Sequence, residues 1–379
     1  MIWLIENKHD NSANMFIKSS YSKDDVIFLL KDIGELIKEQ NNEQREQAIQ
    51  SGIHYSEMLP IEYKPSEKYM DIFYKGLKQN RNKIAVAVGV VAERILALRG
   101  EDLVFVSLAR AGSPAGILLK RYLKYKYDID IPHYSISIIR GKGIDENSIK
   151  YILRKHPNRQ IQFIDGWTGK GAITNELSKA CKNFNEKYLT NIDDRLAVIA
   201  DPAHCTTIYG TREDFLIPSA CLNSTVSGLV SRTVHRKDLI GEDDFHGAKF
   251  YEELIDEDVS NLFIDTIAEQ FKYIDDKVAC GIKEIESNEY NLKTTWIGLK
   301  DVQRLQSEFD IQNINFIKPG VGETTRVLLR RVPWKILIKE ESASLEHIIQ
   351  LAKERNVPVE KYDLLAYECC GLIKSLRRE

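Results

Sequence analysis

The chain of 379 residues lacks the features that mark membrane-bound, secreted or polyanion-coating proteins. No apolar run approaches the roughly 18–20 residues of a membrane helix, and the amino terminus has too short an apolar run for a signal peptide. The formal net charge is only −3, so the chain as a whole shows no bias toward polyanions. The six cysteines form no CxxC pair, which argues against a zinc site and for reduced thiols. We therefore expect a cytoplasmic globular protein with no membrane partner.

Two phosphate-binding motifs are also missing from the glycine-rich stretch at 162–174. A P-loop has four residues between its first Gly and its Gly-Lys pair, whereas only two separate Gly166 from Gly169. The dinucleotide fingerprint G-x-G-x-x-G is absent as well. What is present is an apolar run, an acid (Asp165), a turn with three glycines and the start of a helix. The unpaired N–H groups at such a helix start favour a phosphate.

From residue 84 onward, helical patterns alternate with short apolar strands, which predicts a parallel, doubly wound sheet with helices on both faces. Ligands of such sheets bind at the carboxyl ends of the strands. The loops expected at that edge are basic, glycine-rich or acidic. The strands are predicted at 103–108, 133–139, 161–164 and 195–200, and the loops at 110–112, 140–143, 165–171 and 201–202.

Three further regions flank this core of residues 81–249. Residues 1–80 predict a helical region, with amphipathic helices at 24–38 and 66–77. Residues 250–295 predict a solvated helical connector, because 12 acids and three lysines occur between 252 and 289. Residues 296–379 predict a small α/β/α domain whose last element is a helix.

The small domain resembles the pelota RNA-binding domain, which carries a Lys/Gly-rich turn before a helix. The matching stretch, Ile317–Arg331, reads I-K-P-G-V-G-E-T-T-R-V-L-L-R-R. Residues 296–379 have 14 Lys/Arg against 12 Asp/Glu, which leaves a structural or protein-docking role open as the alternative. By the resemblance, the RNA contacts would be Lys318, Gly320, Gly322, Glu323, Thr324 and Arg326.

The core resembles type I phosphoribosyltransferases, whose 5-phosphoribosyl 1-pyrophosphate (PRPP) motif is an apolar strand, one or two acids and a Gly-rich loop. Here the second acid is replaced by Gly166. The stretches I-D-G-W-T-G-K-G and I-P-S-A-C-L-N-S-T-V-S-G-L-V-S-R-T-V are similar to the bacterial tellurite-resistance (Ter) associated phosphoribosyltransferase family. That family is also labelled as StiP-type cysteine proteases.

The resemblance implies a glycosyltransferase that uses PRPP and Mg²⁺ to ribosylate an unidentified base-like acceptor, releasing pyrophosphate. The product would be a nucleoside-like metabolite in a stress or tellurite-resistance system. Asp165, Arg140 and Lys142 would be catalytic, with Asp165 also near Mg²⁺. PRPP would contact Arg110, Ala111, Gly112, Asp165, Gly166, Trp167, Thr168, Gly169, Lys170 and Gly171.

Other roles stay open at this point. By the resemblance, residues 1–80 would form an N-terminal helical hood over the acceptor, with His54, Tyr55 and Glu57 as acceptor contacts or as ordinary packing and surface residues. Further acceptor contacts are assigned to Asn223, Ser224 and Thr225. One alternative is a cysteine protease with Cys221 as nucleophile and a histidine base at 246, 204 or 235. Another is a catalytically inactive, PRPP-sensing regulator that binds RNA. A homodimer is open too.

Overall fold

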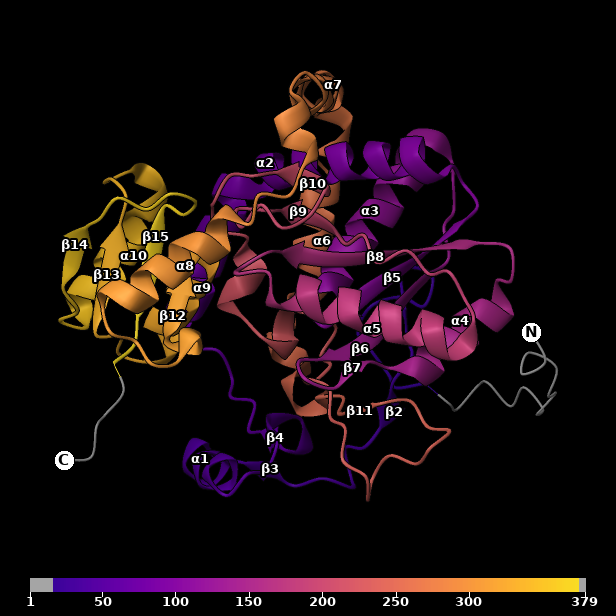
Figure 1. Ribbon diagram of the computed structural model, residues 1–379, viewed down its shortest axis with the longest axis horizontal. Helices are drawn as coiled ribbons and strands as arrows, with labels where there is room; N and C mark the ends of the chain where they lie inside the picture. Colours follow the sequence, from indigo (N-terminus) through magenta and orange to yellow (C-terminus); the bar gives the residue numbers. More distant parts are fainter. Residues whose placement is uncertain (1–15, 375–379) are drawn as a thin grey trace.

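The structure, a computed structural model, describes residues 16–374 (Figure 1). Its central sheet has seven strands in the order β1-β6-β5-β8-β9-β10, with β7 on β6. Every pair along this order is parallel, and only β7 is antiparallel. The strands are β1 (Ile27–Phe28), β5 (Leu103–Ala109), β6 (His133–Ile139), β7 (Gly143–Ile144), β8 (Gln160–Trp167), β9 (Ala197–Ala200) and β10 (Ile208–Thr211).

The mixed α/β fold with a mostly parallel sheet is therefore as predicted, and the reason is burial. All seven residues of β6 are buried, as are the first six of β5, because helices cover both faces of a parallel sheet. The first long helix ends at Gly100, whose φ of 69° suits glycine. The helices of this part are α2 (Glu67–Arg99), α3 (Gly112–Tyr127), α4 (Glu146–Lys155) and α5 (Ala172–Tyr188).

The chain direction decides which helices share a face. The connection β5–α3–β6 moves one way across the sheet, and β6–α4–β8 and β8–α5–β9 move the other way. Right-handed crossovers then put α3 on one face and α4 with α5 on the other. α2 packs beside α3, against β9 and β10. The carboxyl ends of β5, β6, β8 and β9 meet at one edge.

The amino-terminal region differs from the prediction, and residues 1–15 of the expected hood lie outside the described part. No helix forms over 24–38, although Leu29, Leu30 and Ile33 are buried. This segment instead adds strand β1 to the edge of the main sheet and pairs β2 with β11. Long-range pairing overrides the helical pattern. The remaining elements here are β2 (Lys31–Asp32), β3 (Glu39–Gln40), α1 (Asn42–Gln50), β4 (Leu59–Pro60) and β11 (Gly247–Ala248).

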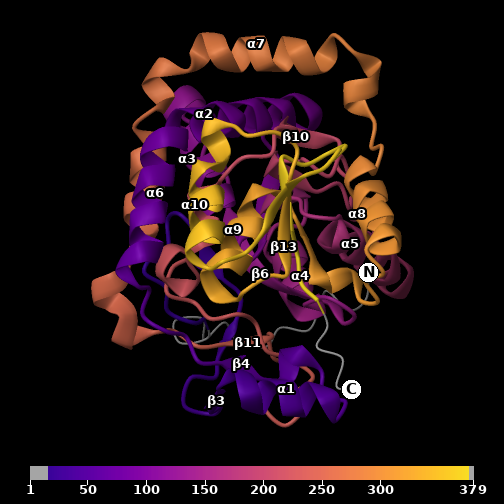
Figure 2. The same cartoon turned by 90° about the vertical axis from the view of Figure 1, so that its left-hand side faces the viewer.

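The acidic region is only partly the solvated connector that its charges predict. α6 (Ser260–Ala268) buries Phe263, Ile264 and Ile267 against α2 and α3. α7 (Asp275–Glu286) lies along the outside of α2 (Figure 2) and buries only Val278 and Ile285. The acidic side chains of α7 are exposed to solvent, whereas its buried apolar side chains pack against α2.

The C-terminal domain has its own sheet, in the order β12-β15-β13-β14, and lies beside the core (Figure 1). The predicted final helix is wrong: residues 369–372 form a fully buried strand between β12 and β13. Two adjacent cysteines and a leucine fill that central position, which local propensity does not reveal. The elements are α8 (Ile297–Glu308), β12 (Ile317–Pro319), α9 (Gly320–Arg330), β13 (Lys335–Ile338), α10 (Glu346–Glu354), β14 (Val359–Lys361) and β15 (Cys369–Leu372).

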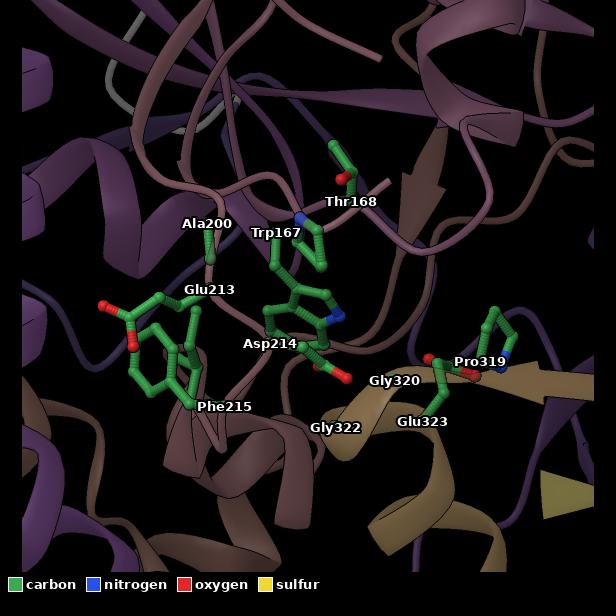
Figure 3. A pocket seen from close by; sticks show the side chains of 12 residues that line it. Trp167, Thr168, Ala200, Glu213, Asp214, Phe215, Pro319, Gly320, Gly322 and Glu323 are labelled. Carbon is green, nitrogen blue, oxygen red and sulfur yellow. The ribbon is translucent and has the colours of Figure 1, made fainter. Parts of the chain in front are cut away.

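Asp214 joins the two domains (Figure 3). Its carboxylate accepts hydrogen bonds from the backbone N–H of Val321, at the start of α9, and of Glu368, each at 2.9 Å. The hydroxyl of Tyr367 also donates to the carbonyl of Gly169 in the core, at 2.6 Å. The domain junction is therefore built from specific polar contacts.

None of the helices within residues 16–374 combines the length and the apolar character needed to cross a membrane.

Candidate functional site

A cavity of about 600 Å³ lies between the carboxyl edge of the main sheet and the C-terminal domain. We call it the interdomain pocket. Its core wall comes from the ends of β6 and β8 and the start of α5, and its other wall comes from β12 and α9. The charged residues that line it are Arg140, Asp165, Lys170, Arg232, Lys318, Glu323, Arg326, Arg330 and Arg331.

Most of the pocket's cations lack an acidic partner. Within the described residues, only Arg326 of the seven lies within 4.0 Å of a carboxylate oxygen, that of Glu323 at 3.8 Å. Lys170 donates to the backbone carbonyl of Ile314 at 2.7 Å, and Arg330 donates to the amide oxygen of Asn223 at 2.8 Å. Neutral partners orient these groups but do not cancel their charge.

The pKa values of the lysines reflect this crowding. Burial, together with the neighbouring Lys318 and Arg140, lowers the pKa of Lys170 to about 8. Burial also lowers the pKa of Lys318, with Arg331, Arg140 and Arg326 adding to the shift against the attraction of Glu323. Each cation is thus less stable in its charged form than it would be in water, and a bound anion would reverse that.

Asp165 is the one acid of the core wall. Burial raises its pKa to about 7, against the hydrogen bond that its carboxylate accepts from the N–H of Gly166 at 2.8 Å. No arginine or lysine within the described residues forms an ion pair with it. The side chain therefore changes charge near neutral pH.

The floor of the pocket is the start of α5. Gly171 precedes the helix with φ of 77°, and no side chain caps the helix N-terminus. By contrast, the backbone N–H of Val321, in the first turn of α9, already donates a hydrogen bond to Asp214. The hydroxyl of Thr168 donates to Asp201 at 2.6 Å, so it holds the loop after β9 in place. The open N–H groups and positive dipole of α5 thus face the cavity.

The loop at 140–143 is held in place from three sides. The N–H of Arg140 donates to the hydroxyl of Tyr55 at 2.9 Å, and Lys142 forms an ion pair with Glu57 at 3.0 Å. Glu176 accepts the N–H groups of residues 141 and 143. Lys142 lies outside the interdomain pocket. Tyr55 and Glu57, predicted as acceptor contacts, therefore position the loop, and His54 lies against Tyr55 with ring centroids 4.5 Å apart.

The loop at 110–112 is only partly at the pocket. Ala111 lines it, but the side chain of Arg110 is only 16% exposed, donates to the carbonyl of Val230 at 3.0 Å and lies 3.9 Å from the carboxylate of Glu62. A Cβ at Gly112 would meet the carbonyl oxygen of Ile164 at 2.5 Å. Gly112 therefore permits close packing of α3 on β8.

The polar stretch at 223–225 lies outside the pocket but contacts two of its arginines through Asn223. Asn223 accepts hydrogen bonds from Arg326 and Arg330, and the N–H of Ser224 donates to Glu62 at 3.2 Å. Ser224 and Thr225 are buried. These residues were predicted to contact an acceptor; the structure places Asn223 against two pocket arginines, and none of the three lines the pocket.

The predicted RNA contacts divide in a similar way. Lys318, Glu323 and Arg326 line the pocket. A Cβ at Gly320 would lie 3.0 Å from Asp214, and one at Gly322 would lie 3.4 Å from Ala220, so both glycines serve the domain junction. The hydroxyl of Thr324 donates to the carbonyl of Lys318 at 3.1 Å.

Among the lining residues that were not predicted are Asn315 and three arginines, Arg232, Arg330 and Arg331. The sequence signal for Arg330 and Arg331 is the Arg-Arg pair at the end of α9, to which the resemblance assigns no function. The signal for Arg232 is the dense polar stretch at 223–232, but only the fold brings its loop to the end of β6.

No thiolate–histidine pair is assembled. Cys221 is 0% exposed, and burial raises its pKa to about 12 against the attraction of Arg330 and Arg326. His246 stacks on His235 and bonds Ser137, and within the described residues no cysteine shares a hydrogen bond with a histidine. Cys221 lies on the short helix at 218–221, which packs under α9.

Comparison with known proteins decides the family. A family model described as "Tellurite-like stress resistance cysteine protease StiP" matches residues 19–268, and a model of the PELOTA RNA-binding domain matches residues 296–375. The chain is 33% identical to "Cysteine protease StiP" of Acinetobacter baylyi over 97% of its own length and 98% of the relative. The chain belongs to the StiP family. No solved structure matched it.

These matches correct the predicted activity. The prediction of a phosphoribosyltransferase, with PRPP as substrate and glycosyltransferase chemistry, is wrong, because both the relative and the family model name a cysteine protease. The link to tellurite-like stress resistance and the pelota-like domain are confirmed. The type I transferase fold is not confirmed beyond its mostly parallel sheet. Gly-rich loops at a sheet edge are shared by many functions, which explains the error.

Mg²⁺ and a cytoplasmic location stay predictions. Across residues 16–374, no three His, Cys, Asp or Glu side chains gather in a way that would hold a metal ion.

Proposed function

We propose that the interdomain pocket binds phosphate groups of RNA. One observation carries the proposal: six of its seven cations have no carboxylate within 4.0 Å among the described residues, and they converge on one cavity. The similarity of residues 296–375 to an RNA-binding domain supports RNA as the source of the anion.

Electrostatic repulsion among the pocket cations favours the binding of an anion. Cations that face one another repel, and this repulsion contributes to the lowered pKa of Lys170 and Lys318. A phosphate between the walls replaces repulsion by attraction, and the arginines can bind its oxygens in bidentate fashion. The open N–H groups of α5 add a further phosphate contact. Binding should therefore release counterions and weaken as salt rises.

The test is RNA binding by matched lysine variants. Lys318→Gln removes one pocket cation, and Lys339→Gln removes an exposed lysine elsewhere in the C-terminal domain. We expect Lys318→Gln to weaken the affinity for single-stranded RNA and to reduce the salt slope by about 1, with Lys339→Gln unchanged. Equal salt slopes for the two variants would overturn the proposal.

The Acinetobacter relative favours a second candidate, cleavage of peptide bonds by a cysteine thiolate. Cys221 is the cysteine to test, because it lies at the domain junction with Arg326 and Arg330 nearby. A buried, protonated thiol does not attack a peptide. This activity therefore requires α9 to move away from the helix at 218–221, against which it packs.

Two variants separate this candidate from a general loss of folding. Cys221→Ala should abolish peptide cleavage by the full chain, whereas Cys280→Ala, at the exposed cysteine of α7, should retain it. Measurement of both against a denatured-protein substrate decides the matter. Cleavage by Cys221→Ala at the wild-type rate would exclude Cys221 as the nucleophile.

A further inference from the structure

The excess positive charge of the C-terminal domain lies at the pocket, and the rest of the domain carries no excess of cations. From 296 to 374, the described part of the domain, the sequence has 12 Lys/Arg and 11 Asp/Glu, and four of those cations with one of those acids line the pocket. Among these described residues, the count outside the pocket is therefore 8 cations against 10 acids. Proteins that follow a long stretch of nucleic-acid backbone present a continuous basic surface. The balance outside the pocket is unsuited to that.

Inside the pocket the imbalance is large. Seven cations and two acids surround a cavity of about 600 Å³. An internal phosphodiester brings one negative charge to such a space, and its neighbours along the strand would need to fit as well. A terminal chain of phosphates brings several charges in a compact form.

The cations also sit on opposing walls, as a compact anion requires. On the core wall, the Tyr55 ring is flanked by two guanidiniums, with Arg232 at 4.7 Å and Arg140 at 5.7 Å from its centroid. On the opposite wall, Asn223 holds Arg326 and Arg330 through one shared amide oxygen. Both pairs are oriented before any ligand arrives, which lowers the entropic cost of binding.

We propose that the ligand group of the interdomain pocket is a terminal di- or triphosphate, carried by the 5′ end of an RNA or by a free nucleotide. This inference rests on the proposed phosphate-binding function of the same pocket. The core arginines take one side of the phosphate chain, the α9 arginines take the other, and the start of α5 takes the innermost phosphate.

The experiment compares ligands of one RNA sequence. The full chain is titrated into a 3′-labelled single-stranded RNA that ends in a 5′-triphosphate or in a 5′-hydroxyl, and binding is followed by fluorescence anisotropy. We expect the triphosphate RNA to bind at least tenfold more tightly. A separate titration of the chain into fluorescently labelled ATP measures directly whether a nucleotide binds without the rest of the RNA.

Each outcome separates the two proposals. Equal affinity for both RNAs overturns the terminal-phosphate inference and leaves RNA binding standing. Binding of ATP without binding of either RNA supports the inference with a free nucleotide as source and overturns the RNA proposal. Binding of none of the three overturns both.

A matched pair of arginine variants ties the result to the pocket. Arg232→Gln removes a lining guanidinium with no carboxylate partner, and Arg236→Gln removes a nearby one that is paired with Asp238. Arg232→Gln should reduce the preference for triphosphate over hydroxyl RNA, and Arg236→Gln should keep it. An undiminished preference in Arg232→Gln overturns the assignment to this pocket.

Discussion

Gly171, at the floor of the interdomain pocket, should be intolerant of even one added methyl group. Its φ is 77°, and a Cβ there would lie 2.3 Å from the Cζ3 atom of Trp296. Left-handed backbone costs an alanine about 1–2 kcal/mol, and pushing a packed ring aside costs about 1–3 kcal/mol more. A less flexible unfolded chain returns roughly 0.5 kcal/mol. We expect Gly171→Ala to lower the free energy of unfolding by about 2–4 kcal/mol.

Gly169, two residues earlier, supplies the control. A Cβ there meets nothing within 4 Å, and its backbone is outside the left-handed region. Urea denaturation of Gly169→Ala should therefore give a midpoint close to that of the wild type. Because Trp296 begins the C-terminal domain, Gly171→Ala should also weaken RNA binding. Equal midpoints for the two variants would refute the steric reasoning.

Two other predictions concern charge. The pKa of Lys170 is lowered to about 8 and that of Asp165 is raised to about 7. Raising the pH from 7 to 9 therefore removes positive charge from the free pocket and completes the ionisation of Asp165, so the dissociation constant for RNA should rise by about tenfold. Anisotropy at fixed salt measures this constant, and a constant value across the pH range would contradict the prediction. Asp301 is buried and accepts the N–H groups of residues 365 and 366, so Asp301→Ala should cost about 2–3 kcal/mol of stability in urea denaturation by leaving them unpaired. Asp363→Ala, at a side chain 90% exposed, should cost little, and an equal loss for both would contradict the argument.

The central sheet could be predicted because its signal is local. The run at 133–139 is apolar enough to be buried on both faces, and it became β6 with the same bounds. The part of the pocket at the carboxyl edge of the main sheet could also be predicted, because the carboxyl ends of parallel strands meet at one edge. Asp165, Lys170 and Arg140 therefore lie together at the pocket, as the loop positions indicated.

What could not be predicted depends on contacts distant in sequence. Residues 24–38 carry a helical pattern but pair with β6 and β11. The strand at 369–372 takes its conformation from β12 and β13. Arg110 was expected to face the ligand, but its guanidinium donates a hydrogen bond to the backbone carbonyl of Val230 instead. The activity was mispredicted because loop composition indicates an anion and not the reaction performed on it.

The most direct measurement is a lysine footprint of the full chain, using an amine-reactive reagent and mass spectrometry with and without saturating RNA. If RNA phosphates occupy the interdomain pocket, RNA should protect Lys170 and Lys318 and leave the distant, exposed Lys339 equally reactive in both samples. Bound RNA that leaves Lys170 and Lys318 unprotected would contradict the account.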